Sequence, residues 1–291
     1  MNLNAAALRA ALAPVNGSGY LLSPLVTICK LFGIDPDQPL ADVRQDMSAR
    51  WIDPGKERWE MPEVTLDDRC RRAIFWDCIF ELPLYHRIRP TCDRAGNVLV
   101  TGSTLRPSDR KNAEVVDLWE KGLGIGRIVH LGADRVLKFD VEGFEVLAAT
   151  QPGGLPVRGG WYYQPSMPYH TEDDMLRVLW QRSVIPSDMM RIPVDFVTST
   201  RSTGYRAHSG DAYGSWFESC RPDPGVVVLM SINPHGPFQY WDAVCALEPK
   251  GFEVHLAAPS AQLGPQKLDY FLGALPRWLR AYLRAQELRL T

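Results

Sequence analysis

The sequence predicts an α/β protein of the Rossmann-like, doubly wound class, with a mostly parallel sheet and an N-terminal helical extension. Short apolar runs alternate with helical segments of about 10–15 residues, and parallel strands need long crossover connections of this kind. Two of the runs, VDFVTST and VVVLMSI, end in polar loops, as strands do where an open parallel sheet offers a ligand site. The chain has 291 residues, 45% of them hydrophobic, which is enough for a full core.

Residues 1–90 are expected to form a helical N-terminal region, and residues 91–291 the Rossmann-like domain. Strong helix formers and leucines at helical spacing predict the first helix. Helices in this region are expected at 3–13, 21–33 and 65–80. The polar stretch 46–64, which contains proline and tryptophan, is expected to be a surface connection.

The second region shows the alternation of strands and helices. Buried strands are predicted in NVLVTGST, RIVHLGA, FEVLAAT, VDFVTST, VVVLMSI and FEVHLAAP. Helices are predicted in DRKNAEVVDLWEKGL, TEDDMLRVLWQR, PFQYWDAVCAL and over about 266–288, with a kink at Pro276. Thr171 is a suitable N-cap for the second of these helices.

Gly122, Gly124 and Gly126 have a spacing that is superficially like a dinucleotide-binding fingerprint. The triplet follows a predicted helix, however, whereas the fingerprint lies between a strand and a helix. The sequence therefore favours a helix C-cap and a turn.

Composition and charge disfavour several classes of protein. The chain has 32 basic and 34 acidic residues, so no overall electrostatic attraction to nucleic acid or anionic lipid is expected. The six cysteines show no zinc spacing, no histidine pattern suggests a metal, and no Gly-x-Ser-x-Gly motif is present. No signal peptide or run of about 18 apolar residues occurs, so a cytoplasmic protein with reduced thiols is expected.

The first predicted strand ends in a turn suited to an anion. Thr101, Gly102, Ser103 and Arg106 combine small residues, hydroxyl groups and a guanidinium at the start of a helix. Backbone N–H groups and arginine bind oxyanions in such a place. The alternative is an ordinary strand-to-helix turn.

A glycine-rich loop that includes Gly153 and Gly154 precedes an acidic helix start. Glu172 is a candidate general base or ribose ligand. Asp173 and Asp174 are expected to be helix-capping acids, because carboxylates stabilise a helix N-terminus.

The segment 198–211 is unusually polar for one that follows an apolar strand. Buried polar groups need partners, so a ligand or a polar network is expected here, and the alternative is a solvated loop. Asp211 is suited to orienting His208. The candidate ligand-binding residues are Thr198, Ser199, Arg201, Ser202, Thr203, Arg206 and His208.

The following strand ends in Asn233, Pro234, His235 and Gly236. His235 is the leading candidate for an acid or base, Asp211 and Glu172 are the other catalytic candidates, and Asn233 is a candidate ligand-binding residue. A hydrogen-bonded structural histidine is the alternative.

The order of these elements resembles the YdcF-like family, which includes the SanA and ElyC envelope proteins. In that family a glycine-rich turn precedes a helix start with an acid, and GGWYYQPSMPYHTEDDM is similar to it, with Glu172 matching the acid. TSTRSTGYRAHSGDAYGSW and VVVLMSINPHGPFQYWDAV are similar in placement to the two later loops. The likeness covers about residues 97–260.

The resemblance implies a Rossmann-type sheet and, for some members, binding of S-adenosylmethionine or another nucleotide-like ligand. The second loop departs from the family pattern, because Arg206, Ala207, His208 and Ser209 stand where a Glu-Asn pair is expected. Gln239 stands where a basic residue is expected. Some relatives are membrane-anchored, but this sequence shows no anchor.

We therefore expect a cytoplasmic protein that binds an anionic or nucleotide-like small molecule at the strand ends, as a transferase or hydrolase. Neither nucleic acid nor membrane is an expected partner. The alternatives are a non-catalytic small-molecule sensor or interaction protein, and a nucleoside-processing enzyme. The last helix carries a leucine stripe and is expected to pack on the sheet or on a second copy in a homodimer, in preference to a membrane surface.

Overall fold

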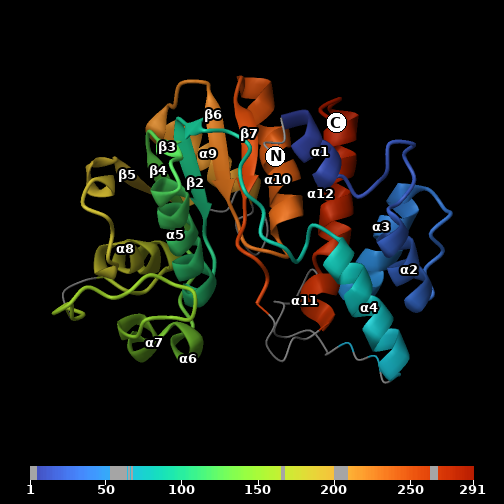
Figure 1. The fold of residues 1–291 in the computed structure, drawn as a ribbon, viewed down its shortest axis with the longest axis horizontal. Helices are drawn as coiled ribbons and strands as arrows, with labels where there is room; N and C mark the ends of the chain where they lie inside the picture. The colour runs from blue at the N-terminus through green and yellow to red at the C-terminus, as the bar shows by residue number, and fades with distance from the viewer. Residues whose placement is uncertain are drawn as a thin grey trace.

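A five-stranded parallel sheet forms the centre of the molecule (Figure 1). The computed structural model describes residues 5–52, 64, 66, 68–164, 168–199, 209–262 and 268–291. Within these residues, the strand order is β5-β4-β2-β6-β7, and every neighbouring pair is parallel. The strands are β2 (Asn97–Thr101), β4 (Ile128–Ala133), β5 (Val194–Ser199), β6 (Val226–Met230) and β7 (Glu253–Ala257). The predicted fold class is confirmed.

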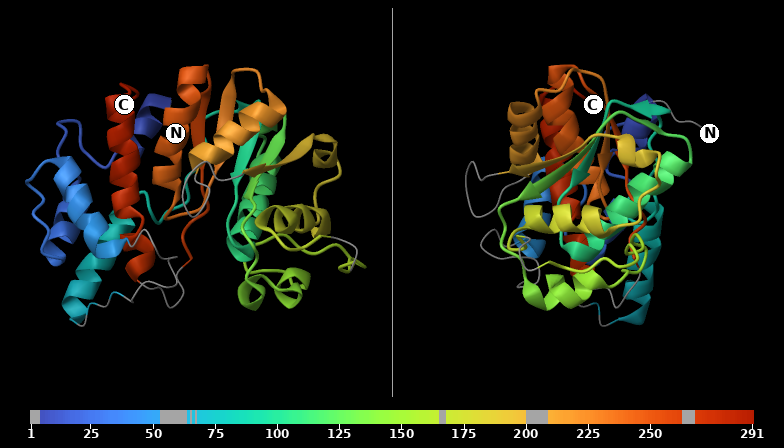
Figure 2. Two further views of the ribbon diagram at one scale, coloured as in Figure 1. Left: turned by 180° about the vertical axis from the view of Figure 1, so that it is seen from behind. Right: turned by 90° about the vertical axis from the view of Figure 1, so that its left-hand side faces the viewer.

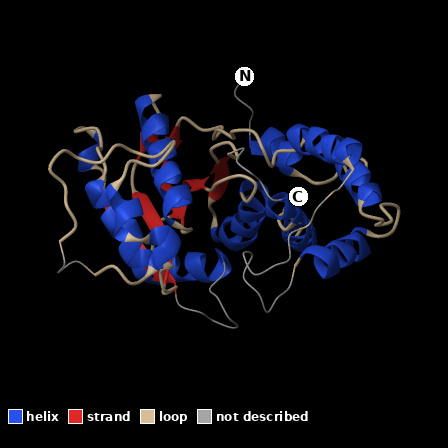
Figure 3. Ribbon diagram, turned by 90° about the horizontal axis from the view of Figure 1, so that it is seen from below, coloured by secondary structure: helices blue, strands red, loops and turns tan. Residues whose placement is uncertain are grey.

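Helices cover both faces of this sheet, as Figure 3 shows from below. On one face, α5 (Leu105–Glu120) packs on β2, and α8 (Glu172–Arg182) packs on β4, β5 and α5. On the other face lie α9 (Ser209–Cys220) and α10 (Gly236–Leu247), and α12 (Leu275–Glu287) packs on α10. Successive strand side chains point to opposite faces, so strands covered on both faces are apolar throughout. A second, two-stranded parallel sheet pairs β1 (Arg94–Ala95) with β3 (Gly124–Ile125).

The chain reverses its direction across the sheet at β2. From β2 it moves outward to β4 and then β5, after which it returns to β6 on the other side of β2 and continues to β7. The register pairs Thr101 with Leu131 and Val100 with Met230. The loops after β2 and β6 therefore leave neighbouring strand ends on opposite faces of the sheet, and such a point in an open α/β sheet is where ligands bind.

The N-terminal helices pack against the end of the sheet domain that β7 and α12 form. These helices are α1 (Ala5–Leu12), α2 (Ser23–Leu31), α3 (Leu40–Trp51) and α4 (Arg69–Glu81). Figure 2 shows α2 and α3, in blue, beside the red α12 and on the opposite flank from β5. Their buried apolar side chains share one core cluster with β6, β7, α10 and α12.

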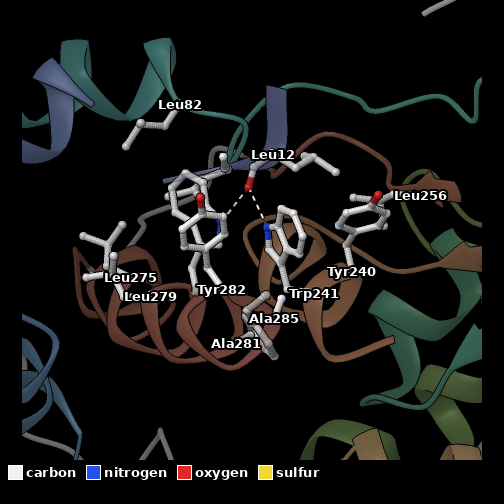
Figure 4. Close-up of a cluster of buried hydrophobic side chains, with 14 of the residues drawn as sticks. Leu12, Leu82, Tyr240, Trp241, Leu256, Leu275, Leu279, Ala281, Tyr282 and Ala285 are labelled. Carbon is white, nitrogen blue, oxygen red and sulfur yellow. Dashed lines mark hydrogen bonds between the residues drawn. The ribbon is translucent and has the colours of Figure 1, made fainter. Parts of the chain in front are cut away.

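The carbonyl of Leu12 links α1 to α10 and α12 in this core by hydrogen bonds. It accepts hydrogen bonds from the indole N–H groups of Trp241 in α10 and Trp278 in α12, each at 2.8 Å (Figure 4). Leu12 and both tryptophans are almost fully buried. One backbone oxygen thus joins three helices from distant parts of the sequence.

The remaining short elements lie between the main ones. After β4 come α6 (Phe139–Glu142) and α7 (Phe144–Ala148), which Figure 1 shows at the lower end of the molecule. The 3-10 helices are Met189–Arg191 and Glu248–Lys250. No helix in the described part of the chain has both the length and the apolar character needed to cross a membrane.

Three sequence expectations about these elements are wrong. FEVLAAT forms helix α7 and not a strand, since a short apolar run fits either structure and only Leu147 of α7 is fully buried. The stretch 46–64 is not wholly a connection, because Val43, Met47 and Trp51 form the buried face of α3. No helix was expected between VDFVTST and VVVLMSI, but α9 begins at Ser209 and buries Tyr213 and Trp216.

The expected last helix is divided in two. It consists of α11 (Leu268–Leu272) and α12, and Pro276 lies in the first turn of α12, where a helix tolerates proline. Pro276 therefore starts a helix and does not kink one. Gly122, by contrast, takes the expected role after α5, with a φ of 94° that is typical of a helix C-terminal glycine.

Candidate functional site

The candidate site lies where β2 and β6 end side by side, and Gln239 of α10 joins the two strand ends. Its side-chain oxygen accepts a hydrogen bond from the Thr101 hydroxyl at 3.3 Å and one from the Ser231 hydroxyl at 2.5 Å. Thr101 also donates to the carbonyl of Met230 at 3.2 Å. The ends of the two strands are therefore held together by side chains as well as by the sheet.

The turn from β2 to α5 presents backbone N–H groups that find no acceptor in the described part of the chain. Thr104 is the N-cap of α5, and its side chain makes no capping hydrogen bond. No described residue accepts a hydrogen bond from the N–H of Ser103, Thr104, Leu105 or Arg106. Unpaired N–H groups at a helix N-terminus attract anions.

Lys111 lies directly beneath this turn and is completely buried. Its ammonium donates to the Thr101 carbonyl, and it lies 3.3 Å from both the Thr101 hydroxyl and the Gly102 carbonyl. Burial lowers the pKa of Lys111 to about 7, although the negative charge of Glu172 opposes this shift. The turn thus has a buried cationic group on its inner side.

Glu172 is buried against the same turn. A Cβ on Gly102 would lie 1.9 Å from Glu172 Oε1, so the carboxylate fits only because residue 102 is glycine. Glu172 Oε2 accepts from Arg135 Nε at 2.9 Å, and Arg135 also binds both carboxylate oxygens of Glu142 in α6, at 2.7 and 2.9 Å. These contacts link the α6 region to the Gly102 turn.

The two carboxylates favour the charged form of Arg135. Burial alone would lower the pKa of Arg135, but the hydrogen bonds to Glu142 and the charges of both carboxylates raise it above its ordinary value. Glu172 is 4% exposed. Its position is that of a carboxylate that holds the turn, in contrast to an acid that reaches into solvent.

His235 is the N-cap of α10, in the loop that follows β6, the strand next to β2. It is half-buried, and its ring lies 5.4 Å from that of Phe238 and 5.2 Å from that of Tyr270. Asn233 is 1% exposed and donates to the carbonyl of His86 at 2.5 Å. Of the two residues predicted after β6, His235 is therefore the more accessible.

The predicted residues after β5 are only partly described. Thr198 is exposed, and Ser199 is buried with its hydroxyl donating to the Gly132 carbonyl at 2.7 Å. Asp211 is half-buried in the first turn of α9. The predicted ligand residues Arg201, Ser202, Thr203, Arg206 and His208 lie outside the described residues.

Gly153 and Gly154 lie against α5, close to Arg106. Arg106 Nε donates to the side-chain oxygen of Gln151 at 3.1 Å. A Cβ on Gly154 would lie 2.1 Å from Asp109 Oδ2, and Gly153 has a φ of 72°. The structure thus gives this loop a packing role beside the N-terminal half of α5.

The helix start at 171–174 is a capping box, as expected for Asp174. The Thr171 hydroxyl accepts from the Asp174 N–H, and Asp174 accepts from the Thr171 N–H. Asp173 pairs instead with Arg177 at 2.9 Å, one turn further along the helix.

A cavity of about 650 Å³ lies near the C-terminal end of α5, away from the candidate site at its N-terminal end, and involves none of the predicted residues. It is formed by α1, the segment 83–93 and the C-terminal end of α5. Arg87 at this cavity is neutralised by Glu114 and Asp117. No group of three or more potential metal ligands occurs among the described residues.

Sequence reasoning missed the three charged residues beneath the turn: Lys111, Arg135 and Glu142. The burial of Lys111 was predictable from the sequence, because it lies on the same helical face as the apolar Val115 and Leu118. No such pattern marks Arg135 and Glu142, since Arg135 reaches Glu172 across 37 residues and it is Arg135 that binds Glu142.

Comparison of the chain with models of known protein families gives no match, and comparison with curated proteins gives none either.

Proposed function

We propose that this protein binds an anionic, nucleotide-like small molecule at the ends of β2 and β6 and acts on it as a transferase or hydrolase. The observation that carries the proposal is the Gly102 turn. It combines four backbone N–H groups without an acceptor in the described residues, a buried lysine beneath them, and His235 on the adjacent strand end.

The physical support comes from the position of the turn as well as its composition. The partial positive charge at the start of α5 favours an anion, and in open α/β sheets ligands bind where the loops after two neighbouring strands leave on opposite faces. No dinucleotide fingerprint is present, so transfer or hydrolysis fits better than hydride chemistry. S-adenosylmethionine and nucleotides are the first candidate ligands, in line with the proposed YdcF-like relationship.

Each residue has a proposed role. Ser103 and the N–H groups of the turn bind the anionic group. Arg106, in the first turn of α5, makes a second contact with it. His235 is the proposed acid or base. Glu172, held by Arg135, keeps the turn in position.

Thermal unfolding with a panel of nucleotides, S-adenosylmethionine and sugar phosphates tests ligand binding. A ligand at 100 times its dissociation constant stabilises the folded state by about 2.7 kcal/mol. Ser103→Glu places a negative charge on the turn and should abolish this stabilisation. Ser187→Glu is the matched control, because it adds the same charge to an exposed turn that precedes the edge strand β5, away from the central strand β2. A flat response of the wild type to the whole panel contradicts the proposal.

A non-catalytic sensor is the second candidate, and the ion pair between Glu172 and Arg135 favours it, because a carboxylate so engaged is a poor base. His235→Ala and Glu172→Ala, measured separately with any ligand found, distinguish the two. In an enzyme, at least one variant retains binding and loses turnover. In a sensor, the wild type binds the ligand and converts none of it.

A further inference from the structure

We propose that Lys111 is a positioning residue for the anion: its buried ammonium fixes the Thr101 and Gly102 carbonyls so that the Ser103 N–H points at a bound oxyanion. This inference rests on the proposed function of the Gly102 turn. It adds a residue that contacts no ligand but determines whether the turn binds an oxyanion such as sulfate or a phosphoryl group.

The position of Lys111 couples its ammonium to the turn. Lys111 lies two turns inside α5 with no exposed surface, and its ammonium meets backbone carbonyls, with no carboxylate in direct contact among the described residues. A buried ammonium is costly unless its protons are bonded. The carbonyls of residues 101 and 102 supply those acceptors, so the conformation of the turn and the position of the lysine depend on each other.

The geometry of the peptide group sets the direction of the Ser103 N–H. In a planar trans peptide, the C=O and the following N–H point in opposite directions. The Gly102 carbonyl faces Lys111, and the Ser103 N–H therefore faces away from it, toward the half-exposed side of the turn. That N–H has no acceptor among the described residues. An ammonium on the carbonyl also polarises the peptide, which strengthens the N–H as a donor.

In the described part of the chain, Glu172, Arg135 and His130 are the titratable groups around the Lys111 ammonium. Glu172 of α8 faces it with a negative charge, and Arg135 neutralises part of that charge. His130 of β4 is completely buried, and burial lowers its pKa to about 3, so it is neutral above pH 5. Among these groups, Lys111 is the one expected to change charge between pH 7 and 10.

Sulfate is the appropriate probe, because it stays a dianion over this pH range. Its affinity is measured by calorimetry at pH 7.5 and 9.5, above the ordinary titration of histidine. For the wild type, we expect affinity to fall at least tenfold between the two values, since binding at high pH requires Lys111 to take up a proton. Lys111→Met should bind about tenfold more weakly at pH 7.5 and change less than twofold by pH 9.5.

Lys121→Met is the matched control. Lys121 lies just beyond the other end of α5, is largely exposed and pairs with Asp117, so this variant should behave as the wild type. If Lys111→Met binds sulfate with wild-type affinity and pH dependence while Ser103→Glu does not bind, the role of Lys111 is refuted and the proposed function stands. Absence of sulfate binding to the wild type also refutes it, whereas the proposed function is decided by the wider ligand panel.

A measurement on the wild type keeps the proposal testable if Lys111→Met does not fold. The ¹⁵N–¹H signal of Ser103 should shift with pH around 7, and sulfate should move the midpoint upward. A Ser103 signal that responds to neither pH nor sulfate overturns the inference.

Discussion

The backbone of Gly102 and the carboxylate of Glu172 are in such close contact that no side chain fits between them. A Cβ on Gly102 would lie 1.9 Å from Glu172 Oε1 and 2.8 Å from the carbonyl oxygen of Leu131. Glu172 in turn binds Arg135, which binds Glu142. The strand-end turn, the start of α8 and helix α6 are therefore packed as one unit.

Gly102→Ala should reduce the free energy of unfolding by about 1–3 kcal/mol, because an added methyl in a packed site forces its neighbours to move. The Glu172 side chain has some freedom to shift, but the Leu131 carbonyl belongs to a central strand and has little. Urea denaturation measures the change. Gly214→Ala is the control: Gly214 lies within α9 with open space around it, and alanine there should stabilise by about 0.5–1 kcal/mol. Equal effects of the two substitutions would contradict the packing argument.

The sheet was predictable because its strands are buried on both faces. Runs such as VVVLM are apolar at every position, and the intervening helices carry apolar stripes at helical spacing. The errors fall on elements with few buried residues. Helix α9 is rich in serine and glycine and buries only Tyr213 and Trp216, so its composition resembles that of a loop.

The location of the candidate site was predictable to a greater extent than its chemistry. Thr101, Ser103 and His235 follow neighbouring strands, as the alternation of strands and helices indicates. The pairing of Glu172 with Arg135 was not predictable, because the loop that contains Arg135 and α6 folds back from the end of β4. Long-range ion pairs of this kind depend on loop geometry that local patterns do not determine.

Replacement of Trp278 should show how much its hydrogen bond to Leu12 contributes to the free energy of unfolding. Trp278→Phe removes ring volume and an N–H donor, whereas Trp216→Phe removes similar volume from an equally buried ring whose N–H has no partner in the described structure. The first variant should therefore be less stable than the second by about 0.5–1.5 kcal/mol. Chemical denaturation of both proteins measures the difference.

The double variant Trp241→Phe/Trp278→Phe leaves the Leu12 carbonyl buried with neither of its donors. An unsatisfied buried acceptor costs about 1–3 kcal/mol, so the double variant should lose more stability than the two single variants together. Simple additivity would show that α1 does not depend on this carbonyl.

Removal of one charge from the ion pair between Asp109 and Arg182 should destabilise the fold far more than removal of both charges. Their side chains are fully buried and 2.8 Å apart, and burial raises the pKa of Asp109 while the charge of Arg182 opposes the shift. Asp109→Asn leaves a buried guanidinium without its counter-charge, and should cost about 3–5 kcal/mol. The double variant Asp109→Leu/Arg182→Met removes both charges and should recover most of that loss.

Lys121→Ala provides the comparison for that pair, because the Lys121 side chain is 44% exposed and that of its partner Asp117 is 32% exposed. An exposed i,i+4 pair contributes about 0.3–0.5 kcal/mol. If Asp109→Asn lowers the free energy of unfolding no more than Lys121→Ala does, the buried pair does not stabilise the fold.

The stability of the protein should rise with pH on account of Lys111. Its pKa is about 7 in the folded state against an ordinary value of 10.5, so between these values the unfolded chain binds more protons than the folded one. Stability then increases with pH, by at most about 1.4 kcal/mol per pH unit. Below pH 7 both states are protonated and the slope vanishes. Lys111→Met should remove this slope, whereas Lys121→Met should keep it. Urea denaturation of the three proteins between pH 6 and 10 measures the difference, and parallel curves for wild type and Lys111→Met would mean that Lys111 titrates normally in the folded protein.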